Sequence, residues 1–323
     1  MKILKGESAG RLKNPVISIG VFDGVHRGHA AVFSVVSKRA ADAGSESAIV
    51  TFRPHPRLVL EDRKSQIKYL TTFEEKAELI AKHGIENLVV FDFTKEFSKV
   101  PPCRFVEEYL VRRTGLRHLV FGFDHHFGHR RQGNYHSLQG CAGLHNFSVE
   151  QLEPVMCEGH RVSSTMIRRM LEKGNVEGAA RLLSYPYSFR GRIVGGRQVG
   201  RMIGYPTANI IPDDDHKLIP ANGVYAVNVL TGGSNLPGMM NIGVKPTLGE
   251  IPGERSMEVH IIGFKGNLYD KRIGVSFMGR IRDERHFGSL ELLSKQLDDD
   301  KRKALDIISS GNPEGGSPPS TSA

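Results

Sequence analysis

The hydrophobic pattern of this chain changes near residue 184, and that change restricts the fold more than any other feature. Before it, apolar strand-like runs alternate with longer stretches of helical periodicity. After it, short β-prone runs are separated by turns that contain glycine or proline. The first pattern is typical of a parallel α/β sheet with helices on both faces, and the second of an antiparallel barrel or sandwich. The 323 residues therefore predict two domains, 1–184 and 185–308.

In the first domain, the run VISIGV at 16–21 is apolar throughout, as in a strand buried on both faces. A helix is expected directly after it, at 27–42. The same alternation predicts strands at 47–53, 86–92, 117–123 and 147–154 and helices at 72–83, 102–115 and 164–183.

The second domain is expected to hold five short strands and one helix. The helix, at 289–308, carries apolar residues at helical spacing, Leu293 and Leu297 among them. The segment 309–323 is rich in Gly, Pro and Ser and should be disordered. The strands are expected within FRGRIV, GVYAVNVL, MMNIGV, MEVHIIGF and RIGVSFMG.

Composition and charge indicate which partners and which cellular compartment suit this chain. The chain carries a net charge of +9 but no long Lys/Arg block, so we expect phosphate-bearing small molecules as partners rather than nucleic acid. No apolar run could span a bilayer, and no secretory signal is visible. Three cysteines without a CxxC pair predict reduced thiols in a cytoplasmic protein. We expect a monomer or a weak homo-oligomer.

Two polar motifs of the first domain suit phosphate chemistry. Residues 20–29 read GVFDGVHRGH and connect the first strand to the first helix, where an open α/β sheet binds ligands. An HxGH there places two imidazoles at a helix N-terminus, whose free N–H groups favour phosphate. Residues 161–168 read RVSSTMIR and begin the last helix with hydroxyls and two arginines. Each motif alone could be an ordinary helix start; the combination is far more specific.

These motifs, with TFRPHP at 51–56, resemble the FMN adenylyltransferase module of bacterial FAD synthetases, in the HxGH nucleotidyltransferase superfamily with its Rossmann-like fold. The resemblance implies that His26 and His29 act on the ATP phosphates. It also implies that the loop with His55 and Pro56, our flavin-binding candidates, faces the flavin or the leaving pyrophosphate. It implies further ATP-binding residues: Asp23, Gly24, Gly28, Arg161, Ser164 and Arg168.

A third segment, GFDHHFG at 122–128, is close to the GxDFxFG pattern of the family and makes Asp124 a flavin-binding candidate. His125 departs from the usual Phe, and Ala30 from the usual Gln. Four histidines between 125 and 136 raise the alternative of a zinc site, but no Cys pair or HExxH accompanies them. We therefore favour a basic loop near phosphate. These histidines are His125, His126, His129 and His136.

The second domain contains no GxxxxGK[ST] loop, which excludes a P-loop kinase on motif grounds. It has instead a glycine-rich stretch, which by itself fits hairpin loops equally well, followed by PTAN at 206–209. The order GYPTANI, NGVYAV, NIG and MEVH resembles the riboflavin kinase domain. By resemblance, Thr207 and Asn209 hold Mg²⁺, Asn209 also contacts the flavin, and Glu258 is the base that deprotonates the riboflavin hydroxyl. The ATP-binding candidates are Gly195, Arg197, Gly200, Arg201, Gly204 and Thr207.

Arg282 is a weaker flavin-binding candidate, since RIRDER at 280–285 reads equally well as a solvated charge run. The resemblance covers about residues 14–308. It implies a small antiparallel β-barrel kinase domain with a C-terminal helix, and two Mg²⁺-dependent reactions: riboflavin and ATP give FMN, then FMN and ATP give FAD and pyrophosphate. The alternatives are that one activity alone is retained, or that the chain is a non-catalytic flavin-sensing regulator that binds nucleic acid.

Overall fold

The protein is represented by a computed structural model, which describes residues 1–61, 67–123, 128, 133, 135–195, 203–244, 255–264, 266, 268 and 270–310. The chain divides into two compact units, Met1–Met166 and Ile167–Ala323. None of the helices in the described part is both long and apolar enough to cross a membrane.

The first unit is built on a six-stranded parallel sheet with the order β1-β4-β3-β2-β5-β6. The four strands predicted after the first one lie within a residue or two of the expected ranges, whereas β1 was not expected. The strands are β1 (Lys2–Lys5), β2 (Val16–Ile19), β3 (Ser47–Arg53), β4 (Asn87–Asp92), β5 (His118–Gly122) and β6 (Ser148–Leu152).

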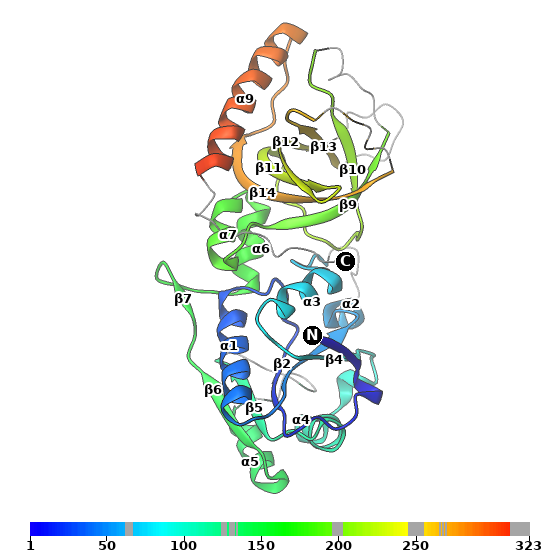
Figure 1. The fold of residues 1–323 in the computed structure, drawn as a ribbon, viewed down its shortest axis with the longest axis vertical. Coiled ribbons are helices and arrows are strands. Elements are labelled where there is room, and N and C mark those ends of the chain that lie inside the picture. The colour runs from blue at the N-terminus through cyan, green and yellow to red at the C-terminus, as the bar shows by residue number, and fades with distance from the viewer. Residues whose placement is uncertain are drawn as a thin grey trace. The chain divides into compact units, whose positions relative to one another are not determined.

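Helices cover both faces of this sheet, as the sequence predicts (Figure 1). Alternate residues of each strand face opposite layers: Ile49 packs with one layer, and Ala48 and Val50 pack with the other. The first layer contains α1 (Arg27–Asp42) and α3 (Phe73–Ala81). The second contains α4 (Pro102–Phe105), the π-helix η4 (Val106–Thr114) and α5 (Tyr135–His145).

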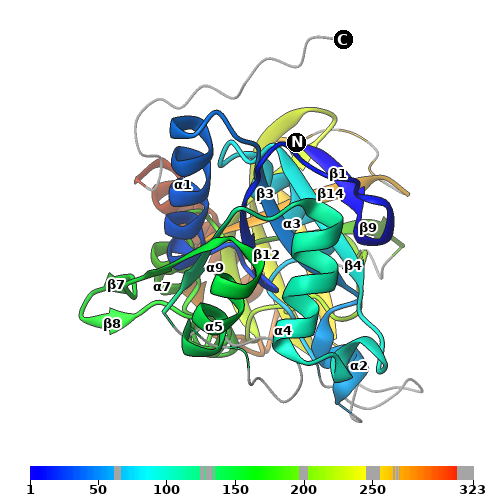
Figure 2. The same cartoon turned by 90° about the horizontal axis from the view of Figure 1, so that it is seen from below.

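Smaller elements complete this part of the chain. A short hairpin of two strands projects from the unit (Figure 2). The predicted helix 164–183 is two helices, because Gly174 takes a left-handed φ of 77° and Asn175 caps the second one through Gly178 N–H. These elements are η1 (Gly6–Ser8), α2 (Pro56–Leu60), η3 (Phe97–Lys99), β7 (Met156–Cys157), β8 (His160–Arg161), α6 (Ser164–Glu172) and α7 (Val176–Leu183).

Two of the cysteines differ from the expectation of reduced thiols. Cys103 on α4 and Cys141 on α5 form a disulfide, with their Cα atoms 5.8 Å apart. Cys157 is the free cysteine. Spacing in the sequence gave no sign of this pair, because the two residues meet only when α5 packs beside α4.

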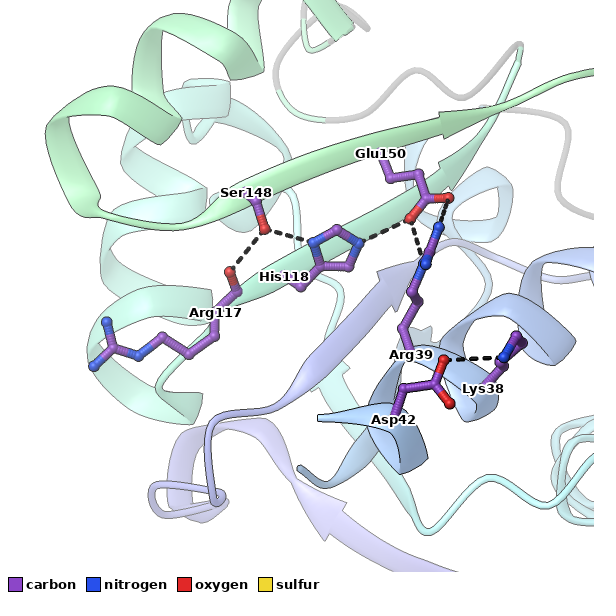
Figure 3. Close-up of polar contacts among 7 residues, drawn as sticks. All are labelled: Lys38, Arg39, Asp42, Arg117, His118, Ser148 and Glu150. Carbon is purple, nitrogen blue, oxygen red and sulfur yellow. Dashed lines mark hydrogen bonds and ion pairs between the residues drawn. The ribbon is translucent and has the colours of Figure 1, made fainter. Parts of the chain in front are cut away.

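A polar cluster secures the edge strand β6 at the end of the sheet where β5 and β6 begin (Figure 3). The His118 ring contacts the Ser148 hydroxyl at 2.5 Å and the Glu150 carboxylate at 3.0 Å. Arg39, from the end of α1, donates two hydrogen bonds to Glu150, at 3.0 and 3.1 Å. The guanidinium hydrogen bonds, followed by the one from His118, hold the pKa of the Glu150 carboxyl below its usual value. The cluster therefore ties α1, β5 and β6 together.

The second unit contains a closed antiparallel barrel with the strand order β10-β13-β12-β11-β14-β9, which decides between the predicted barrel and sandwich in favour of the barrel. One strand, β10, falls on the PTAN motif and was not among the five predicted. The strands are β9 (Ser188–Val194), β10 (Ala208–Pro212), β11 (Gly223–Thr231), β12 (Ser234–Val244), β13 (Arg255–Ile261) and β14 (Arg272–Arg282).

The C-terminal helix α9 (Leu290–Ser310) lies along this barrel, against β11, β12 and β14 (Figure 1). It begins one residue later and ends two residues later than predicted. Its Ala304 and Leu297 pack with Ala226 and Met239 of the barrel. The expectation for the remaining C-terminal residues falls on 311–323, outside the described part of the chain.

Candidate functional site

The turn after β2 lies where the order of the parallel sheet reverses, with β3 on one side of β2 and β5 on the other. Ligands of open α/β sheets bind at such a switch point, beyond the carboxyl ends of the strands. Three residues of the turn have left-handed backbone angles: Phe22 (φ 51°), Gly24 (84°) and Val25 (38°). A β-branched residue such as Val25 is strained there, so the surrounding structure must hold it.

Asp23 supplies part of that support. Its carboxylate accepts hydrogen bonds from the N–H groups of Leu70 (2.9 Å) and Thr71 (3.0 Å). The Gly24 N–H in turn donates to the Thr71 hydroxyl, at 3.0 Å. Asp23, predicted to bind ATP, thus has a carboxylate that anchors the turn to the segment before α3.

The two motif histidines stack on each other at the start of α1. His26 is the N-cap of the helix, and its ring centroid lies 3.6 Å from that of His29. Gly28 lies close to the His26 ring, because a Cβ atom at this position would be 3.1 Å from it. Since helix N-termini present free N–H groups, this arrangement places paired imidazoles where phosphate binds well.

The second motif meets the first. The Ser164 hydroxyl, at the start of α6, donates to the backbone carbonyl of Asp23 at 2.8 Å, across 141 residues of sequence. Arg168 lies one turn further along α6. Arg161, on β8, is exposed, and its guanidinium lies 5.8 Å from the Phe123 ring. The start of the SSTxIR helix is therefore brought to the β2 turn.

The flavin-facing candidates follow β3. His55 caps α2, with its Nδ1 accepting the Arg57 N–H at 3.2 Å, and Pro56 is the first residue of that helix. Because β3 is parallel to β2, this segment also leaves the carboxyl edge of the sheet. The candidates Asp124, His125, His126 and His129 lie outside the described residues, as does the side chain of His136. Among the described residues, no group of three His, Cys, Asp or Glu side chains could hold a metal ion.

The barrel brings its predicted residues together by strand register. Glu258 on β13 is paired with Asn209 on β10 and with Asn241 on β12. The Thr207 hydroxyl donates to the Glu258 carboxylate at 3.1 Å. Glu258 is half-buried between the buried Met257 and Val259. A hydroxyl, two amides and a carboxylate therefore meet on one face of three adjacent strands.

Sequence reasoning missed the residues that hold the PTAN segment. His260, two residues after Glu258, donates from its Nδ1 to the Pro206 carbonyl at 2.9 Å. Burial lowers the pKa of His260, so the ring is neutral at pH 7. Tyr205 donates its hydroxyl to Asp298 of α9, and burial, with that hydrogen bond, raises its pKa to about 12. The alternation of residues along MEVH was the signal that could have identified His260.

The other kinase candidates precede this cluster in the sequence, lie at the end of β14 or fall outside the described residues. Gly204 has a left-handed φ of 80° just before the PTAN segment, and Gly195 is exposed after β9. Arg282, a flavin-binding candidate, pairs with the fully buried Asp300 of α9 at 2.8 Å. Arg197, Gly200 and Arg201 lie outside the described residues.

Comparisons with known proteins agree with this two-part architecture. The family model of FAD synthetase matches residues 9–166, and that of riboflavin kinase matches residues 183–308. A solved structure described as a macrolide-efflux protein from Streptococcus pneumoniae has a TM-score of 0.87 at 29% identity, covering 95% of this chain and 99% of its own.

Curated relatives span nearly the whole chain. The bifunctional riboflavin kinase/FMN adenylyltransferase of Listeria monocytogenes is 38% identical over 90% of this chain and 91% of its own length. Those of Pseudomonas fluorescens and Escherichia coli K12 are 35% and 33% identical, covering 88% and 95% of this chain and 90% and 98% of their own. The chain therefore belongs to the bifunctional riboflavin kinase/FMN adenylyltransferase family, with an FAD synthetase domain followed by a flavokinase domain.

Proposed function

We propose that adenylylation of FMN takes place where the β2 turn meets the starts of α1 and α6. His26 and His29 stabilise the charge that grows on the ATP phosphates as pyrophosphate leaves, and no side-chain nucleophile is needed, because the FMN phosphate itself attacks. Ser164 and Arg168 hold the triphosphate from the second motif, and Arg161 adds charge. The observation that carries this proposal is the Ser164–Asp23 hydrogen bond, which joins two motifs far apart in sequence.

Phosphorylation of riboflavin is assigned to the cluster on β10, β12 and β13. A primary alcohol is a poor nucleophile at neutral pH, so a carboxylate that accepts its proton accelerates transfer. Glu258 has this role, and its contact with the Thr207 hydroxyl supports it. Hydroxyl and amide oxygens are ligands that Mg²⁺ accepts, which fits Thr207 and Asn209 as its holders. Bound Mg²⁺ would neutralise charge on the transferring phosphates.

The two sites act on small molecules in a chain that works as a monomer or a weak homo-oligomer and needs no nucleic acid. We assign residues 1–184 to adenylylation of FMN and residues 185–308 to phosphorylation of riboflavin. The support is that Ser164 of α6 contacts the β2 turn, although α6 beyond Met166 and all of α7 belong to the same compact unit as the barrel.

Separate assays of the two reactions test this assignment. His29→Ala should abolish FAD formation from FMN and leave FMN formation from riboflavin at the wild-type rate. Glu258→Ala should do the reverse. Chromatography of each reaction with Mg·ATP measures both products. Loss of both products in either variant would contradict two separate sites.

A further inference from the structure

Lys76, which the sequence motifs do not single out, lies beneath the β2 turn. It belongs to the first turns of α3, and 6% of its surface is exposed. Its ammonium donates to the Val21 carbonyl at 3.1 Å and to the Thr51 hydroxyl at 3.2 Å. Thr51 is fully buried on β3, and its hydroxyl lies 3.4 Å from the same Val21 carbonyl. One buried cation therefore joins α3, the β2 turn and the end of β3.

Capping of α3 does not require a charge at this position. The N-terminus of α3 is already secured by a capping box between Thr72 and Glu75. Removing an ammonium from water is costly, and replacing buried charges by apolar groups of similar volume is often neutral or stabilising. A methionine would extend the apolar packing of the same helix, where Ala77 and Ile80 are buried.

The groups around Lys76 decide its charge. Burial is the largest influence and lowers the pKa of Lys76 to about 8; Asp23, in the turn, favours the ammonium, and Arg53, the last residue of β3, opposes it. Lys76 is therefore mainly protonated at neutral pH and loses its proton in the mildly alkaline range. The face of the Phe73 ring lies 5.9 Å from the ammonium.

We propose that Lys76 is a positioning residue for adenylyl transfer. By donating to the Val21 carbonyl, Lys76 fixes the left-handed turn that leads to His26. The same contact aligns this turn with the flavin-facing segment after β3. The inference rests on the proposed function of the β2 turn. Val21 immediately precedes Phe22, the first left-handed residue, and Thr51 is two residues before Arg53. A small displacement of reacting groups costs up to about 100-fold in rate, so such a contact matters for catalysis without touching substrate.

Lys76→Met tests the proposal against a purely structural role. We expect kcat for FAD formation to fall roughly 10- to 100-fold, with riboflavin phosphorylation by the same sample unchanged and the thermal midpoint unchanged or higher. Lys76→Arg, which keeps the charge, should recover part of the loss. Lys82→Met, an exposed lysine at the end of the same helix, is the matched control and should behave as wild type.

Thr51→Val removes the second acceptor without removing the cation. Its effect on FAD formation should be smaller, and the double variant with Lys76→Met should lose less than the product of the two single effects, because both act through Val21. The wild-type rate of FAD formation should also decline several-fold between about pH 8 and pH 10, as Lys76 deprotonates. In Lys76→Arg this decline should be absent.

The outcomes separate the failure of this inference from that of the proposed site. If His29→Ala is inactive in FAD formation but Lys76→Met has wild-type kcat, Lys76 is not a positioning residue. The same follows if Lys76→Met loses only stability, or if the alkaline decline persists unchanged in Lys76→Arg. If His29→Ala retains FAD formation, the assignment of the β2 turn itself fails. Should Lys76→Met not fold, the pH profiles of wild type and Lys76→Arg decide.

Discussion

The paired histidines of the proposed adenylyltransferase site lie on one turn, whereas the residues of the proposed kinase site are assembled across three strands. In the α/β domain, the β2 turn, His26 and His29 are consecutive in sequence and sit at the carboxyl edge of a parallel sheet. In the barrel, Thr207 and Glu258 are 51 residues apart and meet only through the pairing of β10 with β13. Histidines positioned by one turn should respond to changes in local backbone geometry. Residues brought together by strand pairing should respond to changes in barrel packing.

The largest effect should come from Glu258→Gln. This change keeps the shape of the side chain and removes the proton acceptor, so FMN formation should fall by about 10²- to 10⁴-fold. Conversion of added FMN to FAD should keep the wild-type rate. Steady-state assays with each flavin measure this; an FMN-forming rate within twofold of wild type would remove Glu258 from the chemistry.

The next largest effect is expected from a change in the packing of α9 on the barrel. Arg282 donates to Asp300, which is fully buried, and Gln296 donates to the same carboxylate. Removing one partner leaves a buried charge, so Asp300→Ala should destabilise the barrel by about 3–5 kcal/mol. Denaturant unfolding followed by barrel-specific hydrogen exchange would measure it.

The companion variant separates packing from flavin binding at Arg282. A double change, Arg282→Met with Asp300→Leu, replaces the ion pair by apolar groups and should restore most of the stability. If Arg282 also contacts flavin, the KM for riboflavin stays raised in the restored protein. A wild-type KM for riboflavin would show that the Arg282 guanidinium pairs with Asp300 of α9 and does not contact flavin.

A smaller effect is expected at the local turn. Gly28→Ala adds a Cβ atom 3.1 Å from the His26 ring, so the imidazole must shift by a few tenths of an ångström. FAD formation should fall by roughly 10-fold, without loss of FMN formation. Gly44→Ala would not serve as a control, because its φ of 59° is itself left-handed; Gly140→Ala on α5, with open space around its Cβ, would.

The smallest effect concerns the cluster at the amino ends of β5 and β6. The folded-state pKa of Glu150 is lowered by Arg39 and His118, so its contribution is present above the unfolded pKa and is lost as pH falls through the folded pKa. Glu150→Gln should therefore lower the thermal midpoint slightly near pH 7, and the difference from wild type should shrink toward pH 3. Both enzyme activities at neutral pH should be unaffected. An equal difference in thermal midpoint at pH 7 and pH 3 would contradict the pairing of Glu150 with Arg39 and His118.

Much of this could be predicted from the sequence, and the failures have physical causes. The strand–helix alternation and the HxGH and PTAN motifs are local patterns, so strands such as β3 and the helix that begins beside His29 were predicted correctly. Lys76, His260 and the Cys103–Cys141 pair act through partners distant in sequence, which no local pattern reveals. The break at Gly174 was missed because glycine is tolerated within helical periodicity, and only its φ of 77° ends the helix.

Mixing the two single-defect proteins tests the independence of the sites most directly. His29→Ala should release FMN from riboflavin, and Glu258→Ala should adenylylate it, so an equimolar mixture supplied with riboflavin and Mg·ATP should form FAD although neither protein does so alone. A mixture that accumulates FMN and forms no FAD, while Glu258→Ala still adenylylates added FMN at the same concentration, would contradict two sites that work separately.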